Sequence, residues 1–95
     1  MARPQHIFVF AYDIVRDRLR TKVADLLEQR LVRVQDSVFE GRMTAQEAKR
    51  LGETLAGMIE PDDSLRIYCI TEAGRDASLA FGPTPLPEAA PYYLV

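Results

Sequence analysis

A carboxylate and a run of positive charges lie close together near the start of the chain. Asp13 follows the unbroken apolar and aromatic stretch 7–12 (IFVFAY), and Arg16, Arg18, Arg20 and Lys22 come directly behind it. A carboxylate can hold Mg²⁺ against a phosphate group, and arginine and lysine side chains bind phosphate directly. This combination of residue types is suited to phosphate, with Asp13 in the middle.

Each half of the pattern also has a purely structural interpretation. An aspartate between a strand and a helix is frequently the N-cap or a turn residue, and the basic side chains could form a solvated helix face. However, four positive charges with only Asp17 among them, at the start of a helix, run against the usual preference for acids at that end. This mismatch favours a functional role for the basic residues.

Two elements are predicted to position this site. Residues 6–12 (HIFVFAY) are apolar on both alternating sets, which is typical of a central strand buried on both faces. A helix is expected from Arg16 to about Arg30, because its apolar residues recur at helical spacing. They are Leu19, Val23, Leu26 and Leu27.

The middle of the chain predicts a hairpin and a second helix. Residues 31–43 are extended, with turn-like residues at 35–37, so we expect two short strands; a single bent strand is the alternative. Thr44 and Glu47 form a capping-box pattern that begins a helix. A strand is expected over 64–70, where Cys69 is predicted to be a small core side chain, and a further short strand over 77–81.

The C-terminal residues differ in composition from the rest. Residues 83–91 (PTPLPEAAP) contain four prolines and predict an extended linker, so we divide the chain into a domain at 1–82 and a segment at 83–95. The chain ends in an apolar, strand-like tail. The tail residues are Tyr92, Tyr93, Leu94 and Val95.

Length and composition limit the class of protein. The 95 residues form one domain, and 47% hydrophobic residues argue against general disorder. A net charge of −2 argues against a strongly basic nucleic-acid binder but allows a local basic patch. The single cysteine excludes an intrachain disulfide and fits a cytoplasmic location, and no apolar run is long enough to span a membrane.

The order of elements predicts an α+β, ferredoxin-like βαββαβ fold with an extra C-terminal strand. Two helices can cover only one face of a four-stranded sheet. We therefore expect the other face to pack against a second copy, giving a homodimer with sheets face to face. The tail 92–95 is expected to add to a sheet edge, either its own or the partner's.

This fold also predicts where the chemistry lies. The first two strands of a split βαβ unit are parallel, so Asp13, the first helix N-terminus and the turn at 35–37 should meet at one edge. A two-fold axis would bring a second Asp13 and complete a minimal Mg²⁺ site. His6, the only histidine, lies roughly 23 Å from Asp13 along an extended strand and cannot serve as its general base.

Three segments together resemble the CRISPR-associated Cas2 family of adaptation proteins. They are Tyr12-Asp13-Ile14 followed by Asp17 and Arg20, the stretch VQDSVFEG at 34–41, and the stretch SLRIY at 64–68. The resemblance covers about residues 6–72. It implies a ferredoxin-like homodimer that bridges dimers of the CRISPR integrase and holds duplex DNA during spacer acquisition.

The resemblance also implies a metal site. Some members of the family are Mg²⁺-dependent endonucleases on RNA or double-stranded DNA, and Mn²⁺ is the expected substitute for Mg²⁺. In those members the strand-end aspartate binds the metal between the subunits, which gives Asp13 a catalytic and metal-binding role. Asp36 departs from the tyrosine often found at its position, and a carboxylate there could bind metal or repel phosphate.

Other positions carry over residue by residue. Tyr12 matches directly, Arg20 matches the helix arginine, and Lys22 stands where some members have a second arginine. Arg33, Ser37 and Phe39 match the second motif. The expected nucleic-acid-binding residues are thus Arg16, Arg18, Arg20, Lys22 and Arg33, and the expected supporting residues are Tyr12, Ser37 and Phe39.

Three functions remain open on the sequence alone. The first is a structural adaptor in spacer integration, which needs no catalysis. The second is a stand-alone metal-dependent endoribonuclease or DNase that uses paired Asp13 carboxylates. The third is a generic ferredoxin-like RNA-binding module, which lacks the usual aromatic motif, although Phe8, Phe10 and Tyr12 alternate along one strand.

Overall fold

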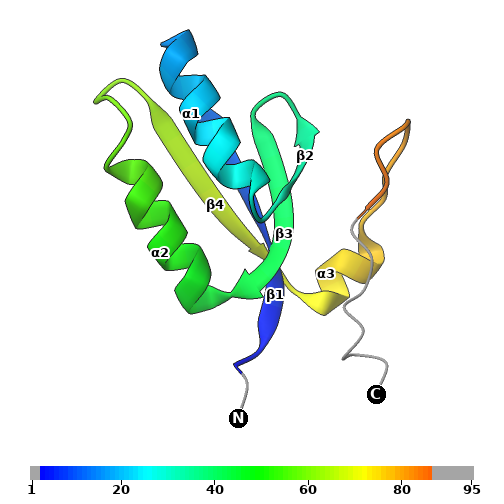
Figure 1. Ribbon diagram of the computed structural model, residues 1–95. Coiled ribbons are helices and arrows are strands. Elements are labelled where there is room, and N and C mark those ends of the chain that lie inside the picture. Colours follow the sequence, from blue (N-terminus) through cyan, green and yellow to red (C-terminus); the bar gives the residue numbers. More distant parts are fainter. Residues whose placement is uncertain (1–2, 87–95) are drawn as a thin grey trace.

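The computed structural model describes residues 3–86, which form a four-stranded sheet and three helices (Figure 1). The elements in chain order are β1 (Gln5–Asp13), α1 (Asp17–Glu28), β2 (Val32–Gln35), β3 (Val38–Thr44), α2 (Ala45–Ala56), β4 (Ser64–Ile70) and α3 (Glu72–Ala77).

The sheet has the strand order β2-β3-β1-β4, with every neighbouring pair antiparallel. Helices α1 and α2 lie side by side on one face of it (Figure 1). This confirms the ferredoxin-like prediction, with β1 at the centre. The break between Gln35 and Val38 also confirms the two-strand interpretation of 31–43 over the single bent strand.

The core lies between the sheet and the two long helices. Phe10 and Phe39 are register partners on β1 and β3, and both are completely buried. Leu27 from α1, Leu55 from α2 and Met43 from β3 are equally buried. Every second residue of β1 therefore faces this core, as a period of two requires.

The second helix begins as predicted. The Thr44 hydroxyl accepts a hydrogen bond from the Glu47 N–H at 3.1 Å, and the Thr44 N–H donates to Glu47 Oε1 at 2.9 Å. Both halves of the capping box are thus formed. The helix start fixes the direction in which the chain leaves β3.

Two predictions for the C-terminal part are wrong. Residues 77–81 form no strand: α3 occupies Glu72–Ala77, and Thr71 caps it by accepting from the Gly74 N–H at 3.1 Å. Cys69 is exposed rather than part of the core, because β4 is an edge strand of the sheet that residues 3–86 form. Alternation along the strand does not reveal which strand is at the edge.

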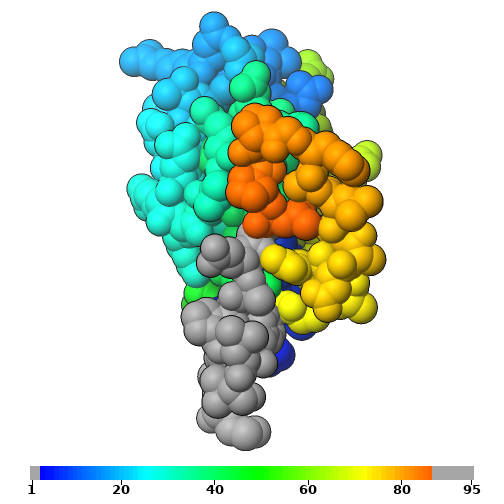
Figure 2. Space-filling model, turned by 90° about the vertical axis from the view of Figure 1, so that its right-hand side faces the viewer, coloured from blue at the N-terminus to red at the C-terminus, as the bar shows by residue number. Residues whose placement is uncertain are grey.

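The face of the sheet away from α1 and α2 is only partly covered. Figure 2 shows α3 and the segment after it lying over this side of the molecule. Ile7, near the start of β1, is 2% exposed and lines a small cavity of about 210 Å³ together with Glu40, Leu79 and Leu86. The rest of this open face carries exposed side chains, described below.

Two sequence predictions fall partly or wholly beyond this region. The predicted docking strand Tyr92–Val95 lies outside the described residues, and residues 83–86 are the only part of the predicted linker within them. None of the helices in 3–86 combines the length and apolar character needed to cross a bilayer.

Candidate nucleic-acid and metal interface

Asp13 is the last residue of β1 and points away from the helices. It pairs in register with Ser64 at the start of β4, and it is exposed. Alternation along β1 puts it on the same face as Val9 and Ala11, whereas Tyr12 faces the core. Asp13 therefore lies at the end of the open face.

The helix-cap interpretation of Asp13 is wrong. The N-cap of α1 is Arg16, in an extended conformation and without a side-chain hydrogen bond to the helix. Asp13 belongs to the strand, three residues before that cap. Its carboxylate is therefore available for another role.

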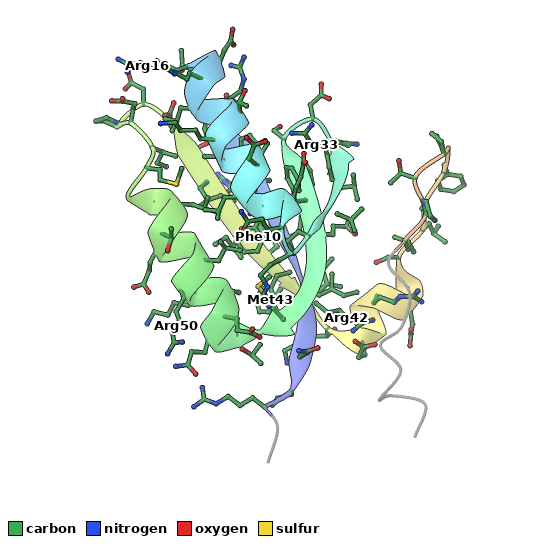
Figure 3. All side chains as sticks on the ribbon, in the orientation of Figure 1. Phe10, Arg16, Arg33, Arg42, Met43 and Arg50 are labelled. Atoms are coloured by element: carbon green, nitrogen blue, oxygen red, sulfur yellow. The ribbon has the colours of Figure 1, made fainter. Side chains whose placement is uncertain are left out.

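The predicted meeting of β1, α1 and the β2–β3 turn is present. The Tyr12 N–H donates to the Ser37 carbonyl at 3.1 Å, and the Tyr12 hydroxyl donates to the Asp36 carbonyl at 3.3 Å. Arg16 and Arg33 also lie toward this end of the molecule, whereas Arg50 lies toward the other (Figure 3). The turn and the end of β1 thus form one edge.

On the helix side of this edge is a groove of about 600 Å³ between α1 and the β2–β3 turn. Its lining includes four of the predicted site residues, Tyr12, Arg20, Arg33 and Ser37. It also includes four carboxylates, from Asp17, Asp25, Glu28 and Asp36. Four carboxylates outnumber the two guanidinium groups, so this groove repels phosphate rather than attracting it.

Arg33, which lines this groove, lies over the buried ring of Phe39. The Arg33 guanidinium carbon lies 5.1 Å from the centroid of the Phe39 ring, and Arg33 forms an ion pair with Glu28 at 3.6 Å. Phe39 stacks on Tyr12 with ring centroids 6.3 Å apart and is itself completely buried. Phe39 therefore supports its neighbours and cannot touch a ligand.

The basic residues of α1 divide into two groups. Arg16 pairs with Glu60 at 3.3 Å, and Arg20 pairs with Asp17. Arg18 and Lys22 are exposed, and within residues 3–86 neither has an ion-pair partner. They are four residues apart on one helix face and are free to bind an external anion.

Arg20 also holds the loop between β1 and α1. Its Nη1 donates to the Ile14 carbonyl at 2.9 Å and to the Val15 carbonyl at 3.0 Å. These are carbonyls that neither strand nor helix satisfies. The sequence suggested Arg20 only as a phosphate ligand, because a side-chain bond to a nearby loop carbonyl has no signature in residue spacing.

The open face next to Asp13 is mostly apolar, with a few polar groups. Val9 and Ala11 pair with Tyr68 and Arg66 on β4, and Arg66 donates to the Tyr68 hydroxyl at 3.0 Å. Tyr68 is 51% exposed and Val32, on β2, is 65% exposed. Such a patch of exposed aromatic and aliphatic side chains is typical of a protein–protein interface.

Glu40 is a carboxylate in the middle of this apolar face. It pairs with Val9 on one side and Val32 on the other. Burial raises the pKa of its carboxyl above the ordinary value of 4.5. Residue spacing alone did not single out Glu40, because its place on the open face depends on the register of β3 with its two neighbours.

The described residues fit magnesium only in part. No group of three or more His, Cys, Asp or Glu side chains within 3–86 is arranged to hold a metal ion. Asp13 is an exposed oxygen ligand, and Mg²⁺ needs only one or two carboxylates when water and phosphate complete its shell. Asp13 is therefore suited to supply one carboxylate ligand, with water and phosphate completing the shell.

Comparison with known proteins agrees with the fold. The model of the family described as CRISPR associated protein Cas2 matches residues 6–77. A CRISPR-associated endoribonuclease Cas2 of Chloroflexus aurantiacus is 39% identical over 75 residues, which cover 78% of this chain and 81% of that protein.

Solved structures give the same result. The crystal structure of Streptococcus pyogenes Cas2 superimposes with a TM-score of 0.68 at 26% identity, covering 80% of this chain and 99% of that one. A chain of a partial Cas6-RT-Cas1–Cas2 complex superimposes with a TM-score of 0.69 at 26% identity, covering 90% and 98%. The chain therefore belongs to the CRISPR-associated Cas2 family.

Proposed function

We propose that the chain is a homodimeric adaptor that joins Cas1 integrase subunits and holds duplex DNA while a new spacer is acquired. The observation that supports it most directly is the open sheet face, which exposes Tyr68 and Val32 and ends in Asp13. A similar chain occurs in a complex that contains Cas1. Two open faces packed together would bury this apolar surface and leave both pairs of helices outside.

In this arrangement the phosphate contacts come from α1. Arg18 and Lys22 are unpaired within the described residues, and their spacing places them on one side of the helix. Arg16, Arg20 and Arg33 already have carboxylate partners. We infer that Arg18 and Lys22 contribute more to duplex binding than the other three.

Charge reversal tests this assignment. The double variant Arg18→Glu with Lys22→Glu should weaken duplex binding and lower the slope of log affinity against log salt by roughly 2 per subunit, because each neutralised phosphate accounts for about 0.9 of that slope. The matched control is Lys49→Glu with Arg50→Glu, which makes the same charge change on α2. Equal weakening in both variants would show only a general charge effect.

A metal-dependent nuclease is the second candidate, because Asp13 is exposed at the end of the face that we expect to meet its two-fold copy. A bound Mg²⁺ would supply Lewis-acid activation of a phosphodiester and a water nucleophile. The role of Asp13 is to hold that ion, and Tyr12 fixes the strand end by its bonds to the β2–β3 turn.

Asp13→Asn separates the two functions. We expect it to abolish Mg²⁺-dependent cleavage of RNA or DNA and to leave the dimer, duplex binding and integration intact. Asp62→Asn, at an exposed carboxylate, is the control for loss of one negative charge. If integration by a folded Asp13→Asn dimer also fails, the adaptor role depends on the metal site and the purely structural proposal is wrong.

A further inference from the structure

One carboxylate joins the two loops that flank Asp13 and its register partner. Asp63 accepts a hydrogen bond from the Val15 N–H at Oδ1, at 3.0 Å, and another from the Glu60 N–H at Oδ2, at 2.8 Å. Val15 belongs to the loop after β1, and Glu60 to the loop before β4. The ion pair between Arg16 and Glu60 links the same two loops a second time.

Val15 is held by its backbone and not by its side chain. The side chain is 71% exposed, so hydrophobic burial does not anchor it. Its N–H donates to Asp63, and its carbonyl accepts from Arg20 at 3.0 Å. Both polar backbone groups of this residue are therefore bound by charged side chains from different parts of the chain.

These contacts lie next to Asp13. Asp13 is two residues before Val15, and Asp63 directly precedes Ser64, the register partner of Asp13. The bonds from the Glu60 and Val15 N–H groups hold the pKa of the Asp63 carboxyl below its ordinary value, as expected for a carboxylate that accepts two backbone hydrogen bonds. One carboxylate thus binds both the loop that follows β1 and the loop that precedes β4.

We propose that Asp63 is a positioning residue for Asp13: by binding the Val15 and Glu60 amides with both of its oxygens, it fixes the end of β1 and so the direction of the Asp13 carboxylate. This inference rests on the proposed role of Asp13 at the open face. It concerns a residue that does not touch the metal or the nucleic acid. Residues that hold a ligand without touching the metal commonly set the orientation of that ligand.

The test compares Asp63→Asn with Asp62→Asn. The first keeps the shape but replaces one acceptor oxygen by an NH₂ group that faces an N–H, so one of the two bonds is lost. The second removes the same charge from the neighbouring residue. Asp63→Glu keeps the charge but moves the carboxylate by one methylene, and we expect it not to restore the wild-type behaviour.

The first readout needs no metal and no activity. In Asp63→Asn, amide hydrogen exchange at Val15 and Glu60 should be faster, and the carboxyl-carbon resonance of Asp13 should move, whereas Asp62→Asn should match the wild type. Unchanged exchange at Val15 would show that Asp63 does not hold the loop. Faster exchange with an unchanged Asp13 resonance would show that it holds the loop without positioning Asp13.

The second readout is a Mg²⁺ titration of the dimer followed by the Asp13 resonance. The concentration for half-saturation should rise roughly tenfold in Asp63→Asn, the lower end of the usual cost of removing a residue that supports a metal ligand. A wild-type protein that shows no response to Mg²⁺ would overturn the metal role of Asp13. The metal-free measurements would then still decide whether Asp63 positions it.

Discussion

On the helix-covered face of the sheet Phe10 and Phe39 are completely buried, whereas on the open face Tyr68 and Val32 keep more than half of their surface exposed. The two faces are made by the same strands, and often by adjacent residues such as Val9 and Phe10. The covered face thus supplies most of the stability of one copy. The open face retains apolar surface that one copy leaves unused, together with the carboxylates of Glu40 and Asp13.

The largest effect should come from the covered face. Phe10→Ala removes a completely buried ring and should lower the free energy of unfolding by about 3–5 kcal/mol, as for other buried aromatic truncations. That is a large part of the total for a small domain. Urea unfolding at low protein concentration measures it, with Tyr68→Ala on the open face as the matched truncation.

Tyr68→Ala should change the stability of a single copy by only about 1 kcal/mol, because the ring is half exposed and its one bond is to the exposed Arg66. If the two variants lose equal stability, the open face contributes to the fold of one copy as much as the core does. The comparison between the faces would then be wrong.

The next effect concerns association. Val9→Glu puts a charge at the centre of the open face and should weaken the dimer by roughly a hundredfold, since an unpaired charge buried in an interface core costs as much as the loss of a hot spot. Sedimentation equilibrium measures the dissociation constant. Ala45→Glu, at the exposed start of α2, is the control, and an acid there suits the helix dipole. A dimer that tolerates Val9→Glu must form through another surface.

The covered face was also the more predictable of the two. The unbroken apolar run of β1, the helical spacing of 19–27 and the capping box at Thr44 are local signals, and each gave the right element because packing on one face reinforced it. These signals depend on residues close together in the chain. The core follows from them once the strand order is known.

The site was less predictable because its contacts cross between distant segments. Arg20 looked like a phosphate ligand, but the structure uses it to bind the carbonyls of Ile14 and Val15. Asp63 gave no signal at all, since its partner Val15 lies in a loop 48 residues away. Sequence spacing shows which charges share a helix face, but only the tertiary structure shows which are already neutralised.

The helix after β4 was missed for a different reason. Residues 71–77 (TEAGRDA) begin with a threonine cap and an acidic first turn, both of which indicate a helix start. At six residues, α3 is too short for a helical period to be visible. It is held instead by packing at the end of the open face and by the ion pair between Glu72 and Arg42 at 2.7 Å.

The smallest effect, and the most specific to the open face, is a dependence of association on pH. The pKa of Glu40 is raised above 4.5 by burial, so folding already favours its protonated form, and a second copy would bury it further. Because its pKa is raised on folding, the Glu40 carboxyl contributes to the stability of the folded chain. This contribution is fully present below pH 4.5 and is lost as the pH rises through the higher pKa of the folded state. The dimer should therefore tighten as the pH falls from neutral toward the ordinary carboxyl value of 4.5.

Glu40→Gln isolates this contribution. The amide cannot ionise, so the variant dimer should be tighter than the wild type at neutral pH and should lose the tightening on acidification. Asp63 has the opposite pH dependence. Because its pKa is lowered, its contribution to the stability of the folded chain is lost only as the pH falls below the ordinary carboxyl range. The two carboxylates therefore titrate in separate windows. A wild-type dissociation constant that stays flat over the same pH range would place Glu40 outside the dimer interface, and the face that Asp13 shares would have to meet a different partner.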